Sequence, residues 1–222
     1  MVAARSKLDT MRGRSRPGDP PLDRETLRRR LRDGCASAVG VLLSADSGAP
    51  VDLEVERAAD VPAAVLIALV AHRGGPGVIL TQRNAHLANH AAEISFPGGR
   101  VESTDNGPEA AALREAFEEI GLDPTRVEML GCLPAHRTIS GFRVDPFVGW
   151  LEPPVRFVLD TREVAAVFEV PLRFVLDPAN HRREALVVDG VRHEFYVIRY
   201  GRRRIWGATA GMLVTLVKVI GG

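Results

Sequence analysis

The sequence predicts a mixed domain of the α+β or α/β sandwich type. Short apolar segments of strand character alternate irregularly with a few helical patterns, and Gly, Pro and Asp residues separate them. No segment recurs at an interval of roughly 20–50 residues, so a repeat architecture is not expected. The 222 residues are 45% hydrophobic and 26% charged, which is ordinary globular composition.

The strand candidates are apolar runs bounded by turn residues. The first two, 61–71 and 77–81, are separated by a Gly- and Pro-rich segment that predicts a β-hairpin. The later candidates are 127–133, 144–151, 186–188 and 193–200. Because His72 and Arg73 end the most apolar run well short of the ~20 residues that span a bilayer, no membrane partner is expected.

Three segments have helical patterns. Leu22, Leu27 and Leu31 recur at helical spacing within a charged stretch. The second helix is expected at 108–120 and the third near 208–219. For the second helix, Pro108 suits the first helical position after a cap at Asn106 or Gly107, and Gly121 suits the left-handed position beyond its end.

The chain begins with a basic stretch, residues 1–21, that is rich in Arg, Ser, Gly and Pro and has no hydrophobic periodicity. We expect a disordered, solvated tail, with a targeting peptide or a nucleic-acid arm as the alternative. The net charge of +1 argues against nucleic acid as a partner of the whole molecule. Cys35 and Cys132 form neither a disulfide framework nor a metal-type pair, and no secretory signal is visible, so a cytoplasmic location is expected.

The most informative segment is 96–122, where a tight loop precedes the second helix. At about 100° per residue, Glu115, Glu118 and Glu119 share one arc of the helix. The opposite arc is expected to be buried, and its members are Ala110, Leu113, Phe117 and Ile120. Taken alone, the glutamates would indicate only an acidic, solvent-exposed helix face, because like charges this close repel one another.

The loop from Phe96 to Gly99 favours a metal site instead. Its two glycines allow backbone carbonyls to approach a ligand closely. Clustered carboxylates together with a backbone carbonyl suit Mg²⁺ or Mn²⁺, with water and phosphate oxygens at the remaining positions. Arg114, adjacent to Glu115, is placed to orient one of the carboxylates.

This segment resembles the Nudix box, G-x5-E-x7-R-E-U-x-E-E-x-G-U, where U is a bulky apolar residue. The run from Arg114 to Leu122 matches its second half except at Ala116. In the first half, counted from Gly99, Asp105 stands where the family has Glu, and eight residues rather than seven separate it from Arg114. This pattern is similar to the coenzyme A pyrophosphatase branch of the Nudix hydrolases.

Other segments also resemble that branch, and together they extend the likeness over residues 22–222. They are Ile79–Arg83, Ser140–Val144 with Pro146, Glu163–Val164 with Val167–Leu172, and Ile205–Ala210. The segment between Arg83 and Phe96 departs from the branch. His90 is kept, whereas Ala88, Ala92 and Glu93 replace its Arg, Gly and Gln. The loss of one guanidinium removes a phosphate donor and bears on substrate identity.

The resemblance implies an α/β/α sandwich with a mixed β-sheet and a Mg²⁺- or Mn²⁺-dependent pyrophosphatase. Its substrate would be coenzyme A or a derivative, cleaved to adenosine 3′,5′-bisphosphate and 4′-phosphopantetheine. The alternatives are a Nudix hydrolase of ADP-ribose, a dinucleotide or a modified nucleoside triphosphate, and a non-catalytic nucleotide-sensing module. A homodimer is expected only from general prevalence.

The resemblance also implies roles for individual residues. Glu115 and Glu119 would hold the cation, with help from Glu118 and the Gly99 carbonyl, and Arg114 would complete the catalytic set. Glu118 or Glu163 would accept the proton of the attacking water. The expected substrate-binding residues are Arg83, His90 and Phe142.

The remaining polar and aromatic candidates have simpler interpretations. Glu163 is expected at the start of a helix, where a carboxylate interacts favourably with the helix dipole. His86 is interpreted as a surface imidazole, and Trp150 and Trp206 as core aromatics. The basic run Arg202–Arg204 is expected to be mostly solvated, with a phosphate contact as the alternative.

Overall fold

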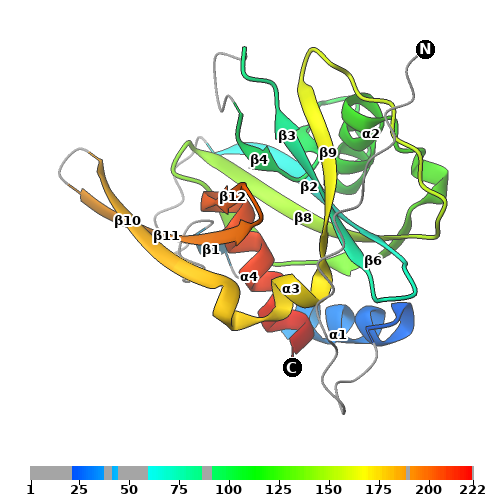
Figure 1. The fold of residues 1–222 in the computed structure, drawn as a ribbon. Coiled ribbons are helices and arrows are strands. Elements are labelled where there is room, and N and C mark those ends of the chain that lie inside the picture. Colours follow the sequence, from blue (N-terminus) through cyan, green and yellow to red (C-terminus); the bar gives the residue numbers. More distant parts are fainter. Residues whose placement is uncertain (1–21, 38–41, 45–59, 87–91, 189–190, 222) are drawn as a thin grey trace.

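A computed structural model describes residues 22–37, 42–44, 60–86, 92–188 and 191–221 (Figure 1). The predicted basic tail, residues 1–21, lies outside the described residues, as do His90 and Ala88.

The centre of the fold is a nine-stranded mixed sheet. Its strands are β1 (Leu42–Ser44), β2 (Val61–Val70), β3 (Gly77–Arg83), β4 (Ile94–Ser95), β5 (Gly98–Arg100), β6 (Glu128–Cys132), β7 (Ala135–Arg137), β8 (Phe142–Leu151) and β9 (Val164–Pro171). The main path runs β1-β7-β8-β2-β3-β4, while β5 pairs with β2, β6 with β8 and β9 with β3. The β1–β7 and β2–β8 pairs are parallel and the others antiparallel.

Helices cover both faces of this sheet (Figure 1). On one face, α2 (Pro108–Ile120) packs in an apolar cluster with residues such as Leu66 and Ile79. On the other face, α1 (Arg24–Ser37) and α4 (Gly207–Gly221) pack in a second cluster around Ile67 and Leu80. The predicted α/β/α sandwich is therefore confirmed.

A smaller antiparallel sheet lies on the α4 side. It is formed by β10 (His181–Val188), β11 (Val191–Tyr200) and β12 (Arg203–Trp206). The short helix α3 (Leu172–Leu176) and the 3-10 turns Pro124–Arg126 and Pro178–Asn180 complete the described elements. In Figure 1 the β10–β11 hairpin extends away from the body of the molecule.

Most predicted elements are present. The predicted hairpin is formed by β2 and β3, with Leu69 opposite Val78 and Val70 opposite Gly77. Strand β10 begins five residues before the predicted 186–188. The apolar pattern did not indicate this first half because it is charged, and cross-strand ion pairs such as Arg183–Glu194 hold it in the sheet. Trp150 is buried and Trp206 is partly buried.

Helix α2 has the predicted bounds but not the predicted buried face. Gly107 is its N-cap, and Gly121 has φ 65° with its N–H donating to the Phe117 carbonyl at 2.8 Å. Phe117, expected in the core, is 56% exposed, and Ala110 and Leu113 are only partly buried. The buried side carries Ala111, Ala112, Ala116, Glu119 and Ile120. Small alanines let the helix lie close to the sheet, and of the three glutamates only Glu119 is buried in this contact.

No described helix has the length and apolar character needed to cross a membrane.

Candidate functional site

The site is built where α2 meets the two glycines of β5. Gly98 and Gly99 pair with Val65 and Ala64 of β2, so the glycine bend belongs to the sheet. A Cβ atom on Gly98 would lie 2.4 Å from the Ala64 carbonyl oxygen, and one on Gly99 would lie 2.4 Å from Glu115 Oε1. Gly98 therefore requires glycine, because a side chain there would meet the backbone of the neighbouring strand, whereas a side chain at Gly99 would displace the Glu115 carboxylate.

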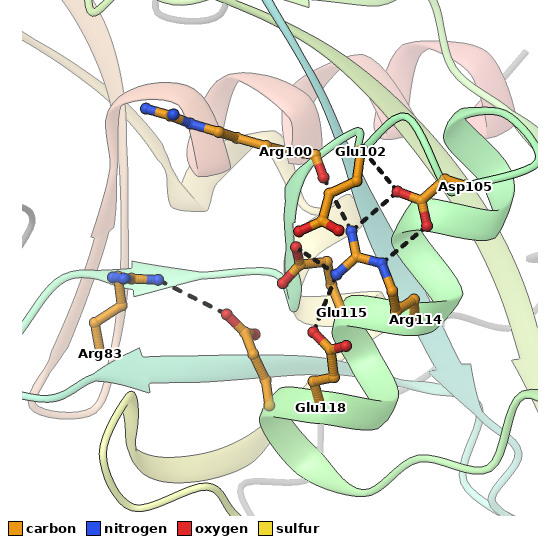
Figure 2. Close-up of polar contacts among 8 residues, drawn as sticks. Arg83, Arg100, Glu102, Asp105, Arg114, Glu115 and Glu118 are labelled. Atoms are coloured by element: carbon orange, nitrogen blue, oxygen red, sulfur yellow. Dashed lines mark hydrogen bonds and ion pairs between the residues drawn. The ribbon is translucent and has the colours of Figure 1, made fainter.

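Arg114 holds the carboxylates of the site in place (Figure 2). Its Nε and Nη2 donate to the two oxygens of Asp105 at 2.8 and 3.0 Å. Its Nη1 donates to Glu115 Oε1 and Glu118 Oε2, both at 3.0 Å. Arg114 thus contacts the Glu115 carboxylate that it was predicted to orient. The Arg114 hydrogen bonds also hold the pKa of Asp105 below its ordinary value.

Glu119 is the most deeply buried of the glutamates, with 4% of its surface exposed. Arg83 Nη1 lies 3.7 Å from its Oε1, while its Oε2 is buried and has no hydrogen-bond partner among the described residues. Burial raises the pKa of Glu119 to about 8; Arg83 opposes this shift, and the negative charges of Glu115 and Glu163 add to it. A buried carboxylate oxygen with no donor is a site at which a cation would be stabilised.

Glu163 joins these helix glutamates from a distant part of the chain. It was expected at the start of a helix, which is wrong, because strand β9 begins at Val164. Its charge contributes to the raised pKa of both Glu115 and Glu119, and burial is the larger cause at each. We call Glu115, Glu118, Glu119 and Glu163 the carboxylate cluster.

The chemistry of the carboxylate cluster fits a hard divalent cation. It offers carboxylate oxygens, including the unpartnered Oε2 of Glu119, next to the backbone of Gly99. In the described part of the chain, no three acidic, His or Cys side chains already converge as a metal-binding group. Arg114 and Arg83 instead lie against the carboxylates, so cation binding requires some of these contacts to rearrange.

The predicted substrate-binding residues are separated. Arg83, at the end of β3, reaches the carboxylate cluster. Phe142 lies on the opposite face of the sheet, packed against the α4-side cluster, with the Arg100 guanidinium 5.6 Å from its ring centroid. Figure 2 shows the Arg100 side chain pointing away from the glutamates. His90 lies outside the described residues, and His86 is exposed.

Sequence reasoning missed one contact, the double hydrogen bond from Arg114 to Asp105. Asp105 was identified only as a departure from the Nudix box. The signal available was its place in the loop before α2, from which a short carboxylate can reach back to the first turns of the helix.

A family model and curated relatives identify the same family. A family model described as NUDIX domain matches residues 60–188, a range that holds the whole carboxylate cluster, Arg83 and Gly99. Proteins named uncharacterized Nudix hydrolase NudL from Escherichia coli (strain K12) and Escherichia fergusonii are each 41% identical over 159 residues. Each match covers 72% of this chain and 82% of the relative.

Solved structures are similar at lower identity. An Ap4A hydrolase binary complex from C. elegans is 22% identical with a TM-score of 0.44, covering 50% of this chain and 80% of that one. The Nudix hydrolase RenU from M. smegmatis is 23% identical with a TM-score of 0.44, covering 60% of this chain and 80% of that one.

Proposed function

Because this chain belongs to the NUDIX family, a family of hydrolases that cleave phosphoric anhydrides, we propose that it cleaves the diphosphate of coenzyme A or a coenzyme A derivative. The products are adenosine 3′,5′-bisphosphate and 4′-phosphopantetheine. The support for this substrate is the set of branch-like motifs outside the Nudix box, from Ile79–Arg83 to Ile205–Ala210. Arg83, which ends the first of these motifs, contacts the carboxylate cluster.

Glu115, Glu119 and Glu118, with the Gly99 carbonyl, are the residues that would hold Mg²⁺ or Mn²⁺. Such a cation neutralises diphosphate charge and lowers the pKa of a bound water. The unpartnered Oε2 of Glu119 is the observation that carries this assignment.

The other residues of the site position groups and move a proton. Arg114 fixes Glu115 and Glu118 through one nitrogen, and Asp105 fixes Arg114 in turn. Arg83 supplies a guanidinium for the oxygens of the diphosphate. Glu163 or Glu118 accepts the proton of the water that attacks phosphorus. Neither of these carboxylates takes part in the contact between Gly99 and Glu115.

The test is a substitution at Glu115. We expect Glu115→Gln to lower kcat by at least about 100-fold, because it removes a carboxylate that acts on the reacting groups. The Glu115 side chain is only 17% exposed and lies against Gly99. We expect the variant to keep the fold, because burial raises the pKa of Glu115 and a neutral amide of the same shape removes a desolvated charge.

Glu109→Gln is the matched control, because Glu109 is exposed on the first turn of the same helix. Unchanged turnover in Glu115→Gln would contradict the assignment of the metal and catalytic residues.

The substrate is tested separately with a panel assayed in Mg²⁺ and in Mn²⁺. It contains coenzyme A, dephospho-coenzyme A, ADP-ribose, a dinucleotide and a modified nucleoside triphosphate. A clear preference for one of the last three replaces coenzyme A with that substrate class. Binding without turnover of any of them identifies a nucleotide-sensing module instead.

We also propose that residues 22–222 form one domain and that the protein is cytoplasmic. The first proposal is supported by α1, which packs against both β6 and α4. The second is supported by the sequence, in which Cys35 and Cys132 form neither a disulfide framework nor a metal-type pair. The homodimer remains a prediction.

A further inference from the structure

Three consecutive arginines, Arg202, Arg203 and Arg204, lie at the turn into β12 and have different surroundings. Arg202 is exposed, as predicted. Arg204 Nη2 donates to Glu184 Oε2 at 2.7 Å. Arg203 instead lies over the ring of Phe168, with its guanidinium carbon 3.6 Å from the ring centroid. The prediction that these arginines are mostly solvated is therefore wrong for Arg203.

The Arg203 guanidinium lies over the Phe168 ring. Within the residues that the structure describes, no ion pair joins it to a carboxylate, and burial lowers its pKa. A guanidinium stacked on an aromatic face keeps its N–H donors in the plane parallel to the ring. Those donors are arranged to bind two oxygens of one anion side by side.

Arg203 lies close to the catalytic end of the sheet but on its other face. Phe168 of β9 stands opposite Leu80 of β3 and packs on the α4-side cluster. Leu80 is three residues before Arg83, which contacts Glu119, so the two sites are about 10 Å apart along the strand. Strand β12 also contacts β4, the strand just before the Phe96–Gly99 loop. An elongated nucleotide that passes around the end of β3 would reach both faces.

We propose that Arg203, held by Phe168, binds a phosphate group of the substrate nucleoside that is not part of the scissile diphosphate. This inference rests on the proposed function and makes Arg203 a residue that determines specificity for a nucleotide with an additional phosphomonoester. In coenzyme A that group is the 3′-phosphate, which dephospho-coenzyme A lacks. The phosphomonoester supplies the dianionic charge and paired oxygens that a flat guanidinium recognises.

The test compares Arg203→Gln with Arg202→Gln, a neighbouring exposed arginine that undergoes the same loss of charge. For each variant, kcat and KM are measured with coenzyme A and with dephospho-coenzyme A. Binding of adenosine 3′,5′-bisphosphate and of AMP is measured by calorimetry. We expect Arg203→Gln to lower kcat/KM for coenzyme A by about tenfold or more, mainly through KM, and to leave dephospho-coenzyme A unchanged. Arg202→Gln should change neither substrate, and Arg203→Lys should recover part of the loss.

The outcomes separate this inference from the proposed function. Equal losses with both coenzyme A compounds, or no loss with either, would overturn the role of Arg203 while the hydrolase assignment stands. If the unmodified protein cleaves neither compound, the proposed substrate fails and binding decides the inference. Weaker binding of the bisphosphate but not of AMP in Arg203→Gln supports it, and unchanged binding of both overturns it.

Discussion

Gly99 and Glu115 are in such close contact that a Cβ atom on the glycine would lie 2.4 Å from Oε1 of the glutamate. Strand β5 and helix α2 therefore meet where the Gly99 backbone contacts the Glu115 carboxylate. This contact fixes how far Glu115 projects toward the rest of the carboxylate cluster. The glycine bend is therefore part of the site itself as well as a connection that leads to it.

Gly99→Ala should separate activity from folding. The backbone at Gly99 does not have a positive φ, so alanine fits the main chain, but its methyl group must displace Glu115. A displacement of about 1 Å in a reacting group lowers catalysis by roughly 100-fold, so we expect a loss of that size in kcat. Gly74→Ala is the control, because a Cβ there has no atom within 4 Å. Full activity in Gly99→Ala would show that the position of Glu115 does not matter.

The bounds of α2 followed from local chemistry, and its orientation did not. Pro108 and Gly121 mark the ends through their own backbone preferences, which is why 108–120 was predicted correctly. Which side faces the sheet depends on the space that the sheet leaves. Phe117 is the largest apolar residue of the helix, yet it is exposed. The alanines face the sheet instead, because they allow a closer contact between helix and sheet than a phenylalanine would.

The Asp105–Arg114 pair predicts a positioning effect on activity. Asp105 accepts two hydrogen bonds from Arg114, and Arg114 in turn binds Glu115 and Glu118. Asp105→Asn removes the charge and one of these acceptors, so Arg114 should move and the apparent affinity for Mn²⁺ should fall by about 10- to 100-fold. The measurement is a Mn²⁺ titration of binding alongside one of activity.

Two controls show whether that effect comes from position. Glu109→Gln removes an exposed carboxylate four residues further on and should leave Mn²⁺ affinity unchanged. Asp105→Glu restores a carboxylate and should recover part of the affinity. Equal behaviour of Asp105→Asn and the unmodified protein would mean that Arg114 keeps its place without Asp105.

The site was predictable where it is contiguous in sequence and unpredictable where it is not. Glu115, Glu118 and Arg114 lie on one helix, so their spacing indicated a cluster. Glu163 approaches only because β9 pairs with β3 and brings residue 164 opposite Arg83. Strand pairing between segments some 80 residues apart leaves no local pattern, so this carboxylate was assigned to the wrong kind of element.

His136 predicts a loss of stability in mild acid. The ring is fully buried, with Nδ1 2.8 Å from the Pro134 carbonyl oxygen and Nε2 2.9 Å from the Thr215 hydroxyl oxygen. Burial lowers its pKa to about 4 from an ordinary 6.5, so the unfolded chain binds the proton more readily than the folded one. The stabilisation is therefore complete above about pH 6.5 and is lost as the pH falls toward 4.

Urea denaturation at pH 7.5 and pH 5 measures this effect. We expect the free energy of unfolding to fall by about 2 kcal/mol from this residue over that interval. His136→Gln, which cannot titrate, should lack this fall, so its change in unfolding free energy from pH 7.5 to pH 5 should be about 2 kcal/mol more favourable than that of the unmodified protein. His86→Gln, at an exposed position, should behave as the unmodified protein. An equal pH dependence in His136→Gln would show that other groups cause the loss.

Ala92 predicts a gain in stability from a single substitution. It has φ 59°, the left-handed region that disfavours a Cβ atom, at a position where the branch that the sequence resembles has Gly. Its side chain is exposed, so no packing is lost on its removal. We expect Ala92→Gly to raise the free energy of unfolding by about 0.5–1 kcal/mol, since relief of the left-handed strain exceeds the added freedom of the unfolded chain. Ala110→Gly on α2 should have the opposite effect and lower the free energy of unfolding by about 1 kcal/mol.

The Ala92→Gly substitution should leave turnover unchanged. The carbonyl of Glu93, the residue after Ala92, accepts a hydrogen bond from the Arg83 N–H at 2.9 Å, and a relaxed turn should keep this contact and the position of Arg83. Destabilisation by Ala92→Gly in urea denaturation would mean that alanine is not strained at this turn.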